Sequence, residues 1–149
     1  MKDSRATAPC GVLEAAESLS KQYAKHGIEG VRRGHSLILG DASLMLQAGI
    51  GYVRAHSAFR PEDEVFIQSH SGDVLGHMNQ DGMTLIDKET GLVHANNVFA
   101  ACPPQGSGLG GSRRAAAEYF AERGCVVLMI SADSGGEVLK FEPGKMSCI

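Results

Sequence analysis

A glycine-rich segment that runs directly into two arginines is the part of this sequence best suited to binding chemistry. It reads Gly106-Ser-Gly-Leu-Gly-Gly-Ser-Arg-Arg114 and precedes a stretch with helical character. Free backbone N–H groups at the junction of such a loop with a helix point outward and attract an anion. The helix dipole disfavours a cation in the first turn by about 0.3–1 kcal/mol, and a bound phosphate reverses that sign. The segment therefore indicates a phosphate site, although Ser112 as a simple helix cap beside solvated Arg113 and Arg114 explains the same residues.

Two common nucleotide-binding folds do not account for this segment. Gly106, Gly108 and Gly111 have the spacing of a dinucleotide-binding loop, and Asp133 follows at about the distance of a ribose ligand. That fold places its loop after the first strand and builds a second half behind it, and too little chain follows Gly111 for this. The glycines are not followed by a Lys-Ser or Lys-Thr pair either, so the segment is not a P-loop.

Asp81-Gly82, just ahead of an apolar run, is the second candidate. Glycine permits a close backbone approach, and the carboxylate can hold a metal or polarise a hydroxyl. The same pair is also common in ordinary turns. No serine or cysteine has a local base that would activate it, so the sequence gives no support to hydrolase chemistry.

The histidines and cysteines are expected to be structural. His70 and His77 match no zinc spacing and are expected on the surface, whereas His35 and His94 fall in or beside predicted strands. The four cysteines form no Cys-x-x-Cys pair, so they indicate neither a zinc site nor a redox motif. Cys125 lies beside an apolar run and is expected to be a buried small hydrophobe.

Strands and helices are predicted to alternate along the chain, because apolar spacing changes repeatedly between the helical and the extended period. The predicted helices are 12–25, 42–48 and 113–123, the last ended by Gly124, with a further helix start at Pro61. The predicted strands are 36–39, 83–86, 92–95, 126–130 and 137–141, of which the last is expected to be the final strand. A hairpin turn is predicted over 87–91. Residues 68–80 are expected to form an irregular loop.

These elements predict an α/β fold with a central, mixed, twisted β-sheet flanked by helices, because the hairpins add antiparallel pairs to an alternating pattern. A chain of 149 residues that is 43% hydrophobic can build one core and is too short for two full domains. We expect residues 1–11 to be a flexible lead-in and residues 12–149 to form a single domain.

Charge and hydropathy limit the partners. The net charge is −3 and the basic residues are scattered in pairs, so a nucleic-acid polymer is not an expected partner. The N-terminus lacks the apolar core of a signal peptide, and no apolar run approaches the roughly 18 residues of a membrane span. We therefore expect a soluble, cytoplasmic protein without a membrane partner.

Taken in order, four segments resemble the diadenylate cyclase domain, which is also the N-terminal domain of the DNA integrity scanning protein, with the archaeal-type relatives most similar. The segment Gly34-His-Ser-Leu-Ile-Leu-Gly-Asp41 resembles the early strand and Gly-Asp turn of that family. The segment 80–87 resembles its Asp-Gly-Ala motif and the following strand, and the segment 108–117 resembles its glycine-rich turn and Arg-His helix start. The last of them, residues 126–131 together with Gly135-Gly136, resembles the closing strand and hairpin of that family. The resemblance spans roughly residues 15–144.

The resemblance implies a function. In that family two domains face each other, each holding ATP and a divalent metal (Mg²⁺ or Mn²⁺), and each 3′-hydroxyl attacks the other α-phosphate to give cyclic di-AMP and pyrophosphate. Carried over by position, Asp81 would orient the 3′-hydroxyl or the metal, and Gly82 would let the nucleotide approach. The residues that would bind or border the substrate are Met83, Gly108, Gly110, Gly111, Ser112, Arg113, Arg114, Ser131 and Asp133. The implied partners are ATP and a second copy of the chain.

Three departures from the family pattern keep other functions open. Met83 replaces the alanine of Asp-Gly-Ala, the histidine of the Arg-His step is absent, and the stretch from Phe59 to Asp81 is short and polar. The alternative to a cyclase is therefore a catalytically degenerate domain that binds ATP or a related nucleotide as a sensor or interaction module. A third possibility is a phosphate-site enzyme that acts on a different nucleotide.

Overall fold

The computed structural model describes residues 11–26, 34–47, 52–58, 64–78, 82–101, 111–130 and 137–149. The helices are α1 (Val12–His26), α2 (Ala42–Met45), α3 (Ser71–His77) and α4 (Gly111–Ala121). The strands are β1 (His35–Gly40), β2 (Val53–Ala58), β3 (Met83–Asp87), β4 (Val93–Ala100), β5 (Val126–Ile130), β6 (Val138–Glu142) and β7 (Lys145–Cys148).

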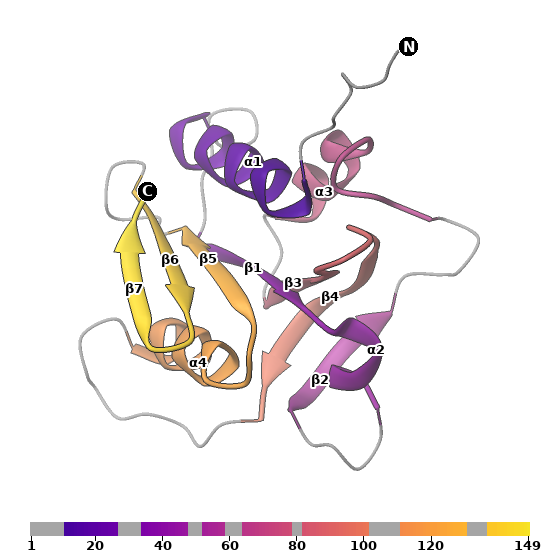
Figure 1. The fold of residues 1–149 in the computed structure, drawn as a ribbon. Helices are drawn as coiled ribbons and strands as arrows, with labels where there is room; N and C mark the ends of the chain where they lie inside the picture. The colour runs from indigo at the N-terminus through magenta and orange to yellow at the C-terminus, as the bar shows by residue number, and fades with distance from the viewer. Residues whose placement is uncertain are drawn as a thin grey trace.

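The seven strands form one mixed sheet in the order β2-β4-β3-β1-β5-β6-β7. The central pair, β1 and β3, is parallel, and every other neighbouring pair is antiparallel. Helices α1 and α3 lie on one side of the sheet, and α2 and α4 lie on the other (Figure 1). The predicted class, an α/β fold with a mixed sheet flanked by helices, is confirmed.

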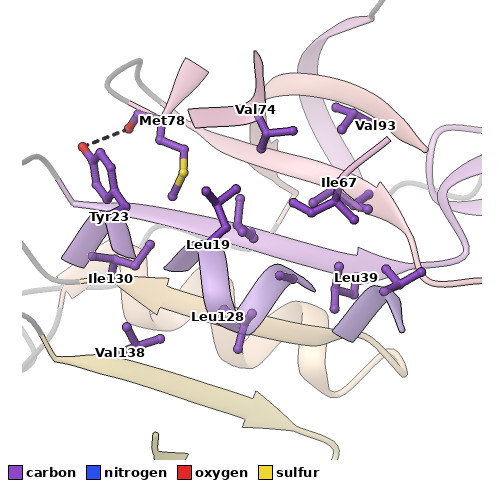
Figure 2. Packing of buried hydrophobic residues seen from close by; sticks show 14 of the residues in the cluster. Leu19, Tyr23, Leu39, Ile67, Val74, Met78, Val93, Leu128, Ile130 and Val138 are labelled. Atoms are coloured by element: carbon purple, nitrogen blue, oxygen red, sulfur yellow. Dashed lines mark hydrogen bonds between the residues drawn. The ribbon is translucent and has the colours of Figure 1, made fainter. Parts of the chain in front are cut away.

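Strand β1 is buried along its whole length because helices cover both of its faces. Its side chains alternate between two cores, with Leu37 and Leu39 on the α1 side and Ile38 on the α4 side. The α1 core is closed by Leu19 and Tyr23, and the Tyr23 hydroxyl donates a hydrogen bond of 3.4 Å to the carbonyl oxygen of Met78 (Figure 2). A strand apolar on both faces is what the run Ser36–Leu39 predicted.

Local signals explain the ends of two helices. The side chain of Asp41 accepts a 3.2 Å hydrogen bond from the Leu44 N–H, so the predicted Gly-Asp turn is the N-cap of α2. At the end of α4, Gly124 has a φ of 91°, and the next N–H, of Cys125, donates to the Phe120 carbonyl. This Schellman closure needs a left-handed residue at C′, which confirms the predicted stop at Gly124.

Four local predictions differ from the structure. Residues 71–77, predicted as loop, form α3, because Val74 and Met78 lie one turn apart and both pack fully buried against the α1 side of the sheet. Pro61 lies outside the described residues, but residues 64–70 form a bridge and a turn rather than the helix expected to follow it. Strand β2 was not predicted, and β7 follows the strand expected to be the last.

Two side-chain contacts connect the helices to the sheet or to the residues beside it. The Nζ of Lys140 on β6 lies 2.8 Å from an Oε of Glu17 on α1, and the two side chains are only 16% and 24% exposed. Cys125 is buried, as predicted, and its sulfur lies 3.5 Å from that of Met45. A Cβ at Gly40 would stand 2.8 Å from both sulfur atoms, so these two side chains occupy the space that glycine leaves.

Candidate functional site

The predicted site segments meet at one edge of the sheet, because of how the central strands pair. Strands β1 and β3 are parallel, so they begin at the same edge, with Gly34 and Gly82 just ahead of them. In the antiparallel pair of β1 and β5, His35 is opposite Ile130, so β5 ends there. Strand β4 also ends there, since Val98 is the partner of Met83. We call this the β1-start edge.

Helix α4 begins at the β1-start edge, as one side-chain contact shows. The guanidinium of Arg113, in the first turn of α4, lies against Gly34 and occupies the space that a Cβ of residue 34 would take. The Arg113 side chain is exposed, and among the residues that the structure describes no acidic side chain forms an ion pair with it. A cation in the first helical turn without an acidic partner is suited to receiving an anion.

Arg114 differs from its neighbour because it is already engaged within the domain. Its Nε lies 3.5 Å from a carboxylate oxygen of Glu118, one turn along α4, and its guanidinium carbon lies 5.9 Å from the centre of the Phe141 ring on β6. These contacts explain Arg114 through packing alone. Of the two arginines predicted to cradle phosphates, Arg113 is the one held at the β1-start edge without an acidic partner among the described residues.

Position 82 needs a glycine because the backbone of β4 lies too close for a side chain. Its φ is 85°, and a Cβ there would stand 2.8 Å from the Cα of Asn97 on β4. Asn97 itself has a φ of 52°, which asparagine tolerates better than most residues. In the structure Gly82 lets strand β4 approach, and the role toward a nucleotide that the resemblance implies for it stays a prediction.

Asn97 lies in a β-bulge of strand β4. Between the pairs Met83–Val98 and Leu85–Ala95, the single residue Thr84 of β3 faces two residues of β4, Asn96 and Asn97. The pairing of β4 with β2 has a shift in the same stretch. Bulges of this kind are common next to functional sites, where they redirect a strand. Sequence reasoning missed Asn97, and the asparagine pair at 96–97 within a predominantly apolar strand was the available signal.

At the β1-start edge, the side chains of Met83 and Thr84 lie on opposite faces of β3. The Met83 side chain is buried in the core on the α4 side, so it contributes to packing there. On the other face, the Thr84 hydroxyl lies 2.9 Å from the Nε2 of His35 on β1. His35 is buried, as the structural role predicted for it requires.

Ser36 is a buried polar residue on β1 that sequence reasoning did not single out. It is 1% exposed and its register partner on β5 is Met129. Within the described part of the chain its hydroxyl has no hydrogen-bond partner. A polar residue at the start of the run Ser-Leu-Ile-Leu was the signal available in the sequence.

The remaining predicted site residues are outside what the structure describes. These are Asp81, Gly108, Gly110, Ser131 and Asp133. Gly111 and Ser112 are placed by their backbone as the first two residues of α4, and their side chains are not described. Their N–H groups belong to the first turn, which has no intrahelical acceptors. The roles assigned to all these residues stay predictions.

Neither a metal cluster nor a membrane span is found in the described ranges. No three His, Cys, Asp or Glu side chains there are gathered as ligands for a metal ion. The predicted metal ligand, Asp81, is not among those residues, so we derive no step through a metal. No helix described here has the length and apolar character needed to cross a bilayer.

Comparison with known proteins identifies solved structures that share this fold. No family model matches the chain, and no curated protein matches its sequence. The structure is similar to that of DacA from Staphylococcus aureus, solved as a double mutant, with a TM-score of 0.63 and 14% identity over 92% of this chain and 85% of that chain. It is also similar to a hypothetical membrane spanning protein from Bacillus cereus, with a TM-score of 0.58 and 16% identity over 93% of this chain and 61% of that chain.

DacA is a diadenylate cyclase, so this chain has an α/β fold of the diadenylate cyclase type. The resemblance noted in the sequence is confirmed at the level of the fold. The more specific likeness to the N-terminal domain of the DNA integrity scanning protein and to archaeal-type relatives stays a prediction. At 14% and 16% identity the comparisons extend to the fold and no further.

Proposed function

We propose that this chain is a diadenylate cyclase, which binds ATP at the β1-start edge and joins two ATP molecules into cyclic di-AMP. The observation that carries the proposal is the contact of Arg113 with Gly34 at the β1-start edge. In the described ranges no acidic side chain pairs with this arginine. The fold shared with DacA supports it independently. The triphosphate of ATP is strongly negative. Its oxygens can therefore accept hydrogen bonds from the Arg113 guanidinium and from the backbone N–H groups in the first turn of α4.

The reaction needs two copies of the site. In each half, the 3′-hydroxyl oxygen of one ATP forms a bond to the α-phosphorus of the other, the bond between the α- and β-phosphates breaks, and pyrophosphate leaves with the electron pair. The hydroxyl proton passes to a base or to water. We assign Asp81 the role of orienting the hydroxyl or a Mg²⁺ or Mn²⁺ ion that accompanies the triphosphate. Positioning and charge neutralisation supply the catalysis.

The direct test is to incubate the purified chain with ATP and Mg²⁺ or Mn²⁺ and to separate the products by chromatography. We expect cyclic di-AMP and pyrophosphate from the wild type and none from Asp81→Asn. Asp73→Asn is the matched control, because Asp73 is an exposed acid in the first turn of α3, a helix on the opposite side of the sheet. Specific activity should rise with protein concentration, because the product requires two facing domains.

A nucleotide-binding module without turnover is the second candidate, and two observations favour it. Met83 fills core space at the position where the family has alanine, and Arg114 is engaged by Glu118 and Phe141. Binding of ATP by calorimetry, without release of pyrophosphate, would support this candidate against the cyclase. Absence of both binding and product would exclude both.

A further inference from the structure

The hydroxyl of Ser36 and the guanidinium of Arg113 lie on the same face of the sheet. Side chains at 34, 36, 38 and 40 of an extended strand share one face. Ile38 packs in the core on the α4 side, and the space beside Gly34 is filled by Arg113 from α4 itself. Ser36 therefore stands between Ile38 and the place where the guanidinium lies, with its side chain directed to the α4 side.

Apolar side chains surround Ser36 on its other sides. Its partner on β5 is Met129, and Met83, one residue before the Leu37–Thr84 pair in the parallel register, lies beside it on β3. Both methionines belong to the core on the α4 side. Of the described residues next to Ser36 on this face, Arg113 is thus the polar one.

The hydroxyl and the guanidinium do not form a hydrogen bond with each other. Two residues along a strand span roughly 6.6 Å, whereas a hydrogen bond joins heavy atoms at about 2.7–3.2 Å. Within the described ranges the buried hydroxyl is left without a partner, which is unfavourable. A tetrahedral oxyanion lying between the two groups can accept a hydrogen bond from each with different oxygens.

We propose that Ser36 donates a hydrogen bond to a phosphate oxygen of the bound nucleotide, beside the oxygens that face Arg113. The inference rests on the proposed function, because it adds a residue to the same site. The 1% exposure of Ser36 is that of the protein without nucleotide, so binding must displace part of what covers the hydroxyl. The Arg113 guanidinium is at the end of an exposed, flexible side chain, so it can move away from Gly34 and contact the anion.

The test compares Ser36→Ala with Ser20→Ala. Ser20 is the matched control, because it is also fully buried with an unpartnered hydroxyl but lies on α1, on the opposite side of the sheet. Calorimetry would measure the Kd of three probes, ATP, inorganic tripolyphosphate and adenosine, and melting would be followed with and without ATP. Ser36→Cys, whose side chain is similar in size, serves as the second variant if the Ser36→Ala protein does not fold.

We expect Ser36→Ala to raise the Kd of ATP and of tripolyphosphate roughly tenfold and to leave adenosine unchanged. The Tm of the nucleotide-free variant should equal or exceed that of the wild type, because an orphan hydroxyl is removed, while the Tm increase caused by ATP should shrink. A merely structural serine would not produce these opposite changes. Ser20→Ala should bind all three probes as the wild type does.

Each other outcome decides the inference. If the wild type binds ATP and Ser36→Ala binds it equally well, the inference is overturned and the proposed function stands. If tripolyphosphate binding depends on Ser36 but ATP yields no cyclic di-AMP, the phosphate contact is supported and the cyclase is rejected. If the wild type binds neither ATP nor tripolyphosphate, both are overturned.

Discussion

The Arg113 guanidinium and the Gly34 backbone occupy complementary space, since the arginine lies where a Cβ of residue 34 would stand. Any side chain at 34 must displace the guanidinium. The displaced atoms are the far end of a flexible side chain, so the displacement is energetically cheap for the fold. The residue before β1 therefore controls where the arginine of α4 is held.

Gly34→Ala should impair nucleotide binding while preserving the fold. Its free energy of unfolding should stay within about 0.5 kcal/mol of the wild type, and its ATP affinity should fall as far as that of Arg113→Ala. Adding Arg113→Ala to Gly34→Ala should have little further effect, because both changes remove the same interaction. Calorimetry with ATP and urea unfolding measure the two quantities.

Gly72→Ala is the control for that variant. Gly72 is an exposed glycine in α3, and a Cβ there would meet nothing within 4 Å. It should bind ATP normally and should stabilise the protein by roughly 0.5–1 kcal/mol, because alanine is the better helix residue. Normal ATP binding by Gly34→Ala would show that the contact with Arg113 has no part in the site.

Gly82→Ala should destabilise the protein more than Gly144→Ala. Both glycines have positive φ, 85° and 72°, so alanine brings left-handed strain of about 1–2 kcal/mol at either position. At Gly144 the new Cβ meets nothing within 4 Å, whereas at Gly82 it meets the backbone of Asn97, which cannot rotate away. Urea unfolding compares the two variants, and equal losses would contradict the close approach of β4.

The contact between Lys140 and Glu17 should make stability depend on alkaline pH. The hydrogen bond from Lys140 to Glu17 raises the pKa of the lysine above its usual 10.5. A raised pKa in the folded state means that the stabilisation is complete below pH 10.5 and is lost as the pH rises through the folded-state pKa. Between pH 9 and pH 12 the wild type should lose up to about 1 kcal/mol more than Lys140→Met.

Urea unfolding at several pH values measures this difference. Tyrosine ionisation and other alkaline effects are common to both proteins, so the comparison isolates the lysine. Glu17→Gln should behave as Lys140→Met does. Parallel pH profiles for the three proteins would show that the contact between α1 and β6 contributes nothing.

The two described cysteines should differ in reactivity. Burial raises the pKa of the Cys125 thiol to about 11, so it should resist iodoacetamide at pH 8 until the protein unfolds. Cys148 is exposed, and its hydrogen bond to Glu137 raises the pKa of its thiol, so Glu137→Gln should speed its alkylation. Peptide mass mapping distinguishes the sites, and labelling of Cys125 in the native protein would contradict its burial.

The parts of the fold that could be predicted are those with strong local signals. The fully buried run of β1, the hairpin of β3 and β4, and the left-handed stop at Gly124 are each encoded within a few residues. Helix α3 was missed because its sequence is short and rich in glycine and polar residues, with Val74 and the C-cap residue Met78 packed into the core. Pro143-Gly144 was an available turn signal for β7, since Gly144 begins the last strand from a positive φ.

The candidate site was predictable in its segments and not in its geometry. The sequence placed Gly82 and Arg113 in two motifs, but their meeting at one edge depends on the parallel pairing of β1 with β3. Ser36 and Asn97 were missed although each had a weak local signal, because their significance arises from neighbours on other strands. Those neighbours are distant in sequence, and local patterns carry no information about register.

The central place of β1 has a consequence for how the chain folds during synthesis. Both neighbours of this strand come later in the sequence, and the second of them, β5, lies near the end of the described chain. At about 5–20 residues per second, β1 waits several seconds on the ribosome with both hydrogen-bonding edges open. An apolar strand in that state can pair wrongly or aggregate, so nascent chains truncated before residue 126 should depend on chaperones in a way that the finished domain does not.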